Sequence, residues 1–186
     1  ADKGTVGAIE EARRLEAKHG YFFVGQHYNP ANPQSHQSTA NEIWEDFGDT
    51  LDTVVCTTGT GGTVSGLSRY LREYKPDMEI VATEPEASPI LSQGIACKHK
   101  IMGTAPGFLP DTLDRSSYGR VLQITAEEAY TTARRLAKEE GILSGISCGA
   151  AVAGMLQLAA LPDYKAKTLL AILPDSGERY LSTDLW

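Results

Sequence analysis

The chain has 186 residues, a net charge of -7 at pH 7, and 22% charged side chains. This acidic balance argues against a surface for nucleic acid or for an anionic membrane. No apolar run in the sequence approaches the roughly 20 residues that a membrane-spanning helix requires. The length allows one domain with a sizeable core, or two small lobes.

The cysteines and histidines favour a reduced compartment without a metal site. Cys56, Cys97 and Cys148 are odd in number and lack the paired spacing of metal ligands. The four histidines are scattered through the sequence without the spacing of zinc ligands. The first residues lack the layout of a signal peptide. We therefore expect a cytoplasmic protein that binds no metal.

The first part of the chain predicts a helix, a short buried strand, an irregular segment and a second helix. In order, these cover about residues 8–18, 21–24, 29–33 and 36–47. Gly20 is placed to end the first helix. Pro30 and Pro33 make the third segment irregular, because each proline fixes its own φ and restricts the residue before it.

The rest of the chain alternates strands with helices. Strands are expected over about residues 51–57, 79–83, 121–124 and 168–173, and helices over about 63–73, 126–141 and 148–160. Thr125 and Glu128 form a capping box at the start of the second of these helices. Residues 85–119 are rich in proline and glycine and are interpreted as a functional loop region. This order predicts an α/β fold with a twisted parallel sheet flanked by helices.

A glycine-rich loop, Gly59-Thr60-Gly61-Gly62-Thr63, joins the strand that ends near residue 57 to the helix that follows. Glycines let the backbone turn sharply and let its N–H groups approach a ligand closely. The free N–H groups and the dipole of the helix favour an anion. Together with the hydroxyls of Thr60 and Thr63, the loop therefore suits a single phosphate monoester. The alternative is a plain glycine turn between a strand and a helix.

Two common nucleotide loops each fail at one residue. A dinucleotide fingerprint needs a third glycine where Val64 stands, and a Walker loop needs a lysine where Leu67 stands. Glu84 ends the next strand at about the distance expected of a ribose-binding acid. A dinucleotide-binding oxidoreductase domain therefore remains an alternative that rests on Glu84.

Four segments in the same order resemble the fold-type II pyridoxal-phosphate enzymes, and within them the cysteine synthases (O-acetylserine sulfhydrylases). Residues 59–63 match the loop that holds the cofactor phosphate. Residues 26–33, Gln-His-Tyr-Asn-Pro-Ala-Asn-Pro, match the family's Gln-Phe-x-Asn-Pro-Ala-Asn-Pro. Residues 145–151, Gly-Ile-Ser-Cys-Gly-Ala-Ala, match Gly-Ile-Ser-Ser-Gly-Ala-Ala, and residues 173–183 match the closing segment. The resemblance covers the C-terminal part, more than half, of a family member.

The resemblance implies pyridoxal 5'-phosphate as cofactor and assigns its binding residues. These are Gly59, Thr60, Gly61, Gly62 and Thr63 for the phosphate and Ser147 for the pyridine nitrogen. A hydroxyl partner does not force that nitrogen to be protonated, so the ring is a moderate electron sink. Ser147 also fits the N-cap of the helix that follows it. Asp175 and Ser176 follow a strand end, where they line the same edge or form a simple turn.

The resemblance also implies a substrate site. Gln26 matches the residue whose amide contacts the substrate α-carboxylate, and its alternative role is a polar residue before a turn. Gly103 and Ala105 belong to the loop near the substrate. In that loop Thr104, Ala105 and Pro106 replace the isoleucine, second glycine and alanine of Gly-Ile-Gly-Ala-Gly-Phe. An added Cβ and a proline ring would narrow the pocket or stiffen the loop, which affects the choice of substrate.

The family's Schiff-base lysine precedes the matched region, so we expect no catalytic residue in this chain. No lysine has the serine-lysine setting of the family; the candidates are Lys3, Lys18, Lys75, Lys98, Lys100, Lys138, Lys165 and Lys167. Residues 1–35 would be the end of a smaller lobe, and residues 36–186 the cofactor-binding lobe. We expect the chain alone to bind the cofactor weakly and without covalent attachment.

By the same resemblance, the intact protein would make cysteine from O-acetylserine and sulfide. It would be a homodimer, and its active-site cleft could bind the C-terminal tail of serine acetyltransferase. One alternative is a sibling β-replacement of the cystathionine β-synthase or O-phosphoserine sulfhydrylase type. Another is a non-catalytic module that binds a partner peptide.

Overall fold

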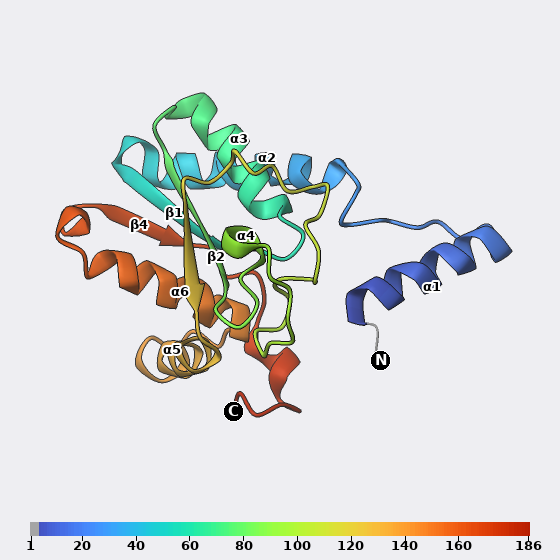
Figure 1. Cartoon of the computed structure of the whole chain (residues 1–186). Coiled ribbons are helices and arrows are strands. Elements are labelled where there is room, and N and C mark those ends of the chain that lie inside the picture. The colour runs from blue at the N-terminus through green and yellow to red at the C-terminus, as the bar shows by residue number, and fades with distance from the viewer. Residues whose placement is uncertain (1–3) are drawn as a thin grey trace.

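The computed structural model describes residues 4–186, in which four parallel strands form one sheet (Figure 1). The strands are β1 (Leu51–Thr57), β2 (Glu79–Pro85), β3 (Arg120–Ile124) and β4 (Thr168–Ala171), in the order β3-β2-β1-β4. In the centre of the sheet Val55 pairs with Val81 on one side and with Ala171 on the other. The predicted parallel α/β fold is confirmed.

Helices cover both faces of this sheet (Figure 1). The helices are α1 (Gly4–His19), α2 (Ala31–Phe47), α3 (Gly62–Tyr74), α4 (Ile90–Gln93), α5 (Ala126–Glu139) and α6 (Ile146–Ala159), with short 3-10 turns at 48–50, 162–164 and 177–180. Helices α2 and α3 pack together on one face, and α5 and α6 pack together on the other. The predicted capping box is present: the Thr125 hydroxyl accepts the Glu128 N–H at 3.1 Å, and the Glu128 carboxylate accepts the Thr125 N–H at 2.8 Å.

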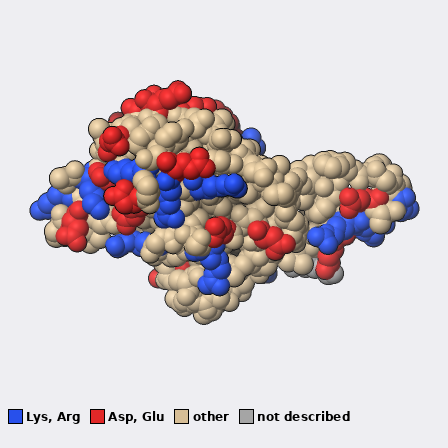
Figure 2. Space-filling view, turned by 90° about the horizontal axis from the view of Figure 1, so that it is seen from above, with Lys and Arg blue, Asp and Glu red and all other residues tan. Residues whose placement is uncertain are grey.

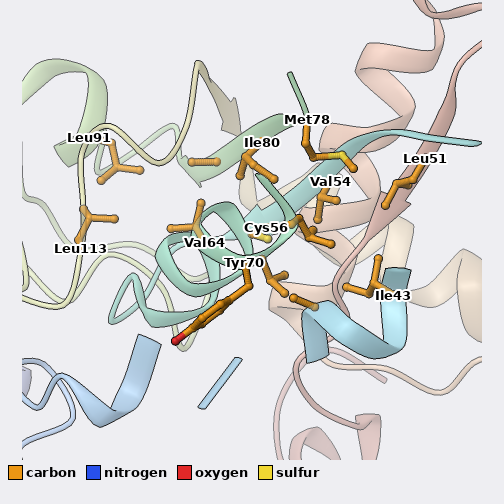
Figure 3. Close-up of a cluster of buried hydrophobic side chains, with 14 of the residues drawn as sticks. Ile43, Leu51, Val54, Cys56, Val64, Tyr70, Met78, Ile80, Leu91 and Leu113 are labelled. Carbon is orange, nitrogen blue, oxygen red and sulfur yellow. The ribbon is translucent and has the colours of Figure 1, made fainter. Parts of the chain in front are cut away.

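The alternation of β1 divides the core between the two helical layers. Val54 and Cys56 belong to the cluster that includes Leu67 of α3 (Figure 3), whereas Val55 belongs to a cluster with Leu158 of α6. All five side chains are completely buried. Burying a leucine of this kind contributes about 1.5–3 kcal/mol. The strand that leads to the glycine loop is thus held from both faces.

The N-terminal part of the chain differs from the prediction. Helix α1 has no buried residue and projects away from the sheet (Figure 1). The strand expected at residues 21–24 is wrong: the segment pairs with no strand among residues 4–186, and Phe22 is 85% exposed. Helix α2 begins at Ala31, not at residue 36, because Pro33 lies in its first turn, where a missing N–H costs no helix bond. The irregular segment therefore ends at Pro30.

The connection between β2 and β3 is mostly irregular, as predicted, apart from the single turn of α4. Glu84, at the end of β2, is only 2% exposed. Its carboxylate accepts the Leu91 N–H at 2.6 Å and the Ser92 hydroxyl. Glu84 therefore binds residues of α4, and this structural role explains the buried acid without a ribose ligand.

Acidic and basic side chains are interspersed on the face seen in Figure 2. Within residues 4–186, no helix is both long and apolar enough to cross a membrane.

Candidate functional site

A cavity of about 410 Å³ lies where β1 ends and the glycine loop begins. In parallel sheets, ligands bind at this carboxyl edge of the strands. We call it the strand-end cavity; its lining residues are Thr5, Gln26, His27, Thr57, Gly59, Thr60, Thr63, Gly103, Thr104, Pro106, Ser147, Pro174 and Asp175. Residues from six separate parts of the sequence meet there.

The glycine loop brings the N-terminus of α3 to this cavity. Gly61 is the N-cap of α3 with φ +79°, and no side chain caps the helix. A Cβ at Gly61 would also come within 2.6 Å of Leu113 Cβ, so both conformation and space require glycine. The first N–H groups of a helix have no intrahelical acceptor. The Gly62 N–H donates to Thr60 Oγ1 at 3.3 Å, and those that follow it are available to a ligand.

The two threonines of the loop are fixed from behind by α2. Thr60 Oγ1 accepts a hydrogen bond from Asn32 Nδ2 at 3.0 Å, and Thr63 Oγ1 lies 3.1 Å from His36 Nε2. On the other side of the loop, Thr112 Oγ1 donates to the Thr60 carbonyl at 2.6 Å. The sequence pattern did not identify Asn32 or His36 as site residues. Both lie about 28 residues away from their partners, and no local spacing connects them.

Ser147 brings a second helix N-terminus to the same cavity. It is the second residue of α6 and is 5% exposed. The N-cap of α6 is Gly145, so the N-cap role considered for Ser147 is wrong. No side chain caps α6 either. The cavity therefore meets the positive ends of α3 and α6, and both favour negative charge.

Asp175 lines the cavity as well, next to the start of α6. Its carboxylate accepts the Tyr180 hydroxyl at 2.5 Å, and the Cys148 thiol lies 3.3 Å from it. Burial, together with the Asp175 carboxylate, raises the pKa of Cys148 to about 11 and raises the pKa of Tyr180 well above its usual range. Both groups stay protonated at neutral pH and can donate to Asp175. Ser176, by contrast, is absent from the described lining and pairs with Ser144 in a β-bridge.

Of the three residues expected to contact the substrate, two line the cavity and one does not. Gln26 and Gly103 line the cavity. Ala105 lies behind the lining: it is 6% exposed, has φ +39°, and donates its N–H to the Thr58 carbonyl at 3.0 Å. The neighbouring Pro106, which replaces the family's alanine, lines the cavity instead. Gly61 and Gly62 likewise shape the loop from behind the lining.

Among the described residues that line the cavity there is no lysine. Lys3 lies outside the described residues. The lining offers backbone N–H groups, neutral hydroxyls and the Gln26 amide as donors. Those of the glycine loop suit a dianionic phosphate monoester, and the Ser147 hydroxyl suits a ring nitrogen. The residues therefore fit the phosphate-bearing cofactor that the resemblance implies.

The fold and this cavity define an α/β protein with a cavity suited to an anionic ligand at the carboxyl edge of its parallel sheet. The sequence model of a family described as pyridoxal-phosphate dependent enzyme matches residues 1–175. The chain belongs to this family, whose members depend on pyridoxal phosphate.

Known relatives narrow the comparison. The cysteine synthase of Staphylococcus aureus is 46% identical over 182 residues, which are 97% of this chain and 58% of that protein. The crystal structure of cysteine synthase from Entamoeba histolytica matches with a TM-score of 0.94 and 41% identity, over 100% of this chain and 55% of that one. The structure of an O-ureido-L-serine synthase variant matches with a TM-score of 0.92 and 44% identity, over 98% of this chain and 57% of that one. The chain thus spans between one half and two thirds of the length of these relatives.

Proposed function

We propose that this chain supplies the cofactor-binding lobe of an enzyme that makes cysteine from O-acetylserine and sulfide. The relatives named cysteine synthase support cysteine biosynthesis as the general role. The observation that carries the proposal is the strand-end cavity, which collects Gln26, Thr60 and Thr63, and Ser147 from three distant parts of the chain. Each of these residues offers a neutral donor that suits a separate part of the cofactor or the substrate.

In this proposal, the glycine loop and Ser147 bind different parts of the cofactor. The glycine loop, including Thr60 and Thr63, holds the cofactor phosphate at the N-terminus of α3. Ser147 would hydrogen-bond the pyridine nitrogen, and a hydroxyl partner would leave that nitrogen free to remain unprotonated. When bound, the cofactor supplies an electron sink that lets acetate leave from the β-carbon. Gln26 holds the substrate carboxylate through its amide N–H₂, which orients the β-carbon for sulfide.

The lysine that joins the cofactor covalently and acts as general base belongs, in this proposal, to a segment outside residues 4–186. Residues 1–35 would then complete a smaller lobe. Helix α1 buries no residue in the structure, which is consistent with this role. A homodimer in the cytoplasm, and a cleft that accepts the tail of serine acetyltransferase, complete the proposal by family resemblance.

One specific observation favours a sibling β-replacement as the second candidate. Ala105 carries φ +39° and Pro106 lines the cavity at the loop near the substrate. A non-glycine residue with positive φ is uncommon, and such strain gathers at ligand sites. The O-ureido-L-serine synthase variant, at 44% identity, lies between the two cysteine synthases, at 46% and 41%. Overall sequence identity therefore does not indicate which nucleophile the enzyme uses. The loop that holds Ala105 and Pro106 can distinguish between nucleophiles.

An assay of the natural protein that contains this chain separates the candidates. We expect cysteine from O-acetylserine and sulfide, at a higher kcat/KM than cystathionine from serine and homocysteine. Pro106 lines the cavity in place of the family's alanine. Because we expect its ring to narrow the cavity, sulfide, the smaller nucleophile, should be preferred. Faster turnover with homocysteine would favour the sibling reaction, and no turnover with either pair would favour a binding module. Pro106→Ala is the matched variant, and it should narrow the difference between the two nucleophiles.

A further inference from the structure

Two side chains on one face of α2 contact the hydroxyls of the glycine loop. Asn32 and His36 are four residues apart, so they lie one above the other on the helix surface. Asn32 contacts Thr60 and His36 contacts Thr63. Neither Asn32 nor His36 lines the strand-end cavity, whereas both threonines do. The two contacts therefore lie behind the loop, where they can set the direction of its hydroxyl hydrogens.

The direction of the Thr60 hydrogen follows from its neighbours. Asn32 Nδ2 also donates to the Gln26 carbonyl at 2.7 Å, and a carbonyl only accepts, so the amide atom that faces Thr60 Oγ1 is the nitrogen. Thr60 Oγ1 accepts from Asn32 and from the Gly62 N–H at 3.3 Å. Both of its lone pairs are then used. Its own hydrogen is left to donate, and the cavity is where a phosphate oxygen would receive it.

The direction at Thr63 depends on which ring nitrogen of His36 carries the proton. Burial lowers the pKa of His36, which favours a neutral ring with a single N–H. If the proton is on Nδ1, then Nε2 accepts the hydrogen bond that the Thr63 hydroxyl donates. The hydroxyl then has only lone pairs to offer to the cavity. If the proton is on Nε2, His36 donates to Thr63 and leaves the threonine hydrogen free. Only the second arrangement gives a phosphate oxygen a donor.

We propose that His36 is a positioning residue for the cofactor phosphate, donating Nε2–H to Thr63 so that the Thr63 hydroxyl donates to a phosphate oxygen. This role rests on the proposed phosphate site in the glycine loop and adds a residue outside it. His36 then donates to Thr63 in the same way as Asn32, also on α2, donates to Thr60. The helix then determines the polarity of both hydroxyls in the loop.

The test compares binding of pyridoxal 5'-phosphate and of pyridoxal, which lacks the phosphate, to the 186-residue chain by NMR titration. His36→Leu should weaken pyridoxal 5'-phosphate about 10- to 150-fold, the range of a hydrogen bond to a charged group, and leave pyridoxal unchanged. His36→Gln keeps an N–H near the position of Nε2 and should recover most of the affinity. Equal weakening of both ligands would mean a general structural effect and would overturn the role.

A double-mutant cycle with Thr63→Val shows whether His36 acts through Thr63. In the Thr63→Val background, His36→Leu should cause no further loss of pyridoxal 5'-phosphate affinity. A full additional loss there would overturn the proposal. If Thr63→Val itself leaves the affinity unchanged, the phosphate site fails, which is a separate result from failure of His36.

A direct measurement covers the case in which His36→Leu does not fold. Nitrogen-15 NMR of the histidines in the unaltered chain, with pyridoxal 5'-phosphate bound, should show the proton of His36 on Nε2. A proton on Nδ1 with Nε2 bare would overturn the proposal without any variant.

Discussion

At the residue scale, the site depends on donors without charge. Backbone N–H groups of the glycine loop, the hydroxyls of Thr60, Thr63 and Ser147, and the amide of Gln26 converge on one cavity. Such donors hold a dianion through many short contacts instead of a single cation. Two of these groups, the hydroxyls of Thr60 and Thr63, contact Asn32 and His36 of α2, which orient them in our proposal.

The three cysteines differ in environment, and this predicts their chemistry. Burial raises the pKa of Cys56 to about 12 and that of Cys148 to about 11, whereas Cys97 is exposed. Since the thiolate is the nucleophile, iodoacetamide at pH 8 should label Cys97 alone in the folded chain. In urea all three should be labelled. Mass spectrometry of the peptides measures both states, and labelling of Cys148 in the folded chain would contradict its burial.

The same pKa shifts predict how stability depends on pH. A buried thiol whose pKa is raised keeps its proton longer in the folded state than in the unfolded state. The contribution of such a thiol to the free energy of unfolding is therefore complete at pH values below its unfolded pKa, near 9. It is lost as the pH rises towards the folded pKa of about 11 or 12. The free energy of unfolding in urea should fall between pH 9 and pH 11. A flat profile over that interval would count against the burial of Cys56 and Cys148.

At the element scale, the capping box of α5 offers a test that does not involve the site. Thr125→Ala removes the acceptor of the Glu128 N–H and should lower the free energy of unfolding by about 1 kcal/mol. Thr131→Ala, at an exposed position within the same helix, is the matched control and should change it by less than about 0.5 kcal/mol. Equal effects of the two substitutions in urea unfolding would contradict the cap.

Most elements from residue 51 onward could be predicted from the sequence, because each carries its own local signal. The apolar run of β1 and the box at Thr125 are of this kind. The strand expected at residues 21–24 could not be judged in this way. A buried strand needs a neighbour to cover its side chains, and among residues 4–186 no strand pairs with this segment. Pro33 was also misleading, since the first turn of α2 tolerates its missing N–H.

At the scale of the whole molecule, the site depends on contacts that no local pattern contains. The sequence located Gln26, the glycine loop and Ser147 through matched segments, and the fold brings them to one cavity. The strand order β3-β2-β1-β4 and the contact of α2 with the loop come from packing between distant segments. For that reason Asn32 and His36, and the placement of Ala105 behind Pro106, emerged only from the structure.

The central claim is that the strand-end cavity of this chain holds the phosphate of pyridoxal 5'-phosphate. Thermal unfolding of the chain with pyridoxal 5'-phosphate, with pyridoxal and with NAD tests it most directly, because a ligand that binds only the folded state raises the midpoint. The double variant T60V/T63V keeps every surface lysine, so it controls for reaction of the aldehyde with those lysines. We predict that pyridoxal 5'-phosphate raises the midpoint more than pyridoxal does, that NAD leaves it unchanged, and that the double variant T60V/T63V loses the difference. A rise with NAD but none with pyridoxal 5'-phosphate would contradict the claim.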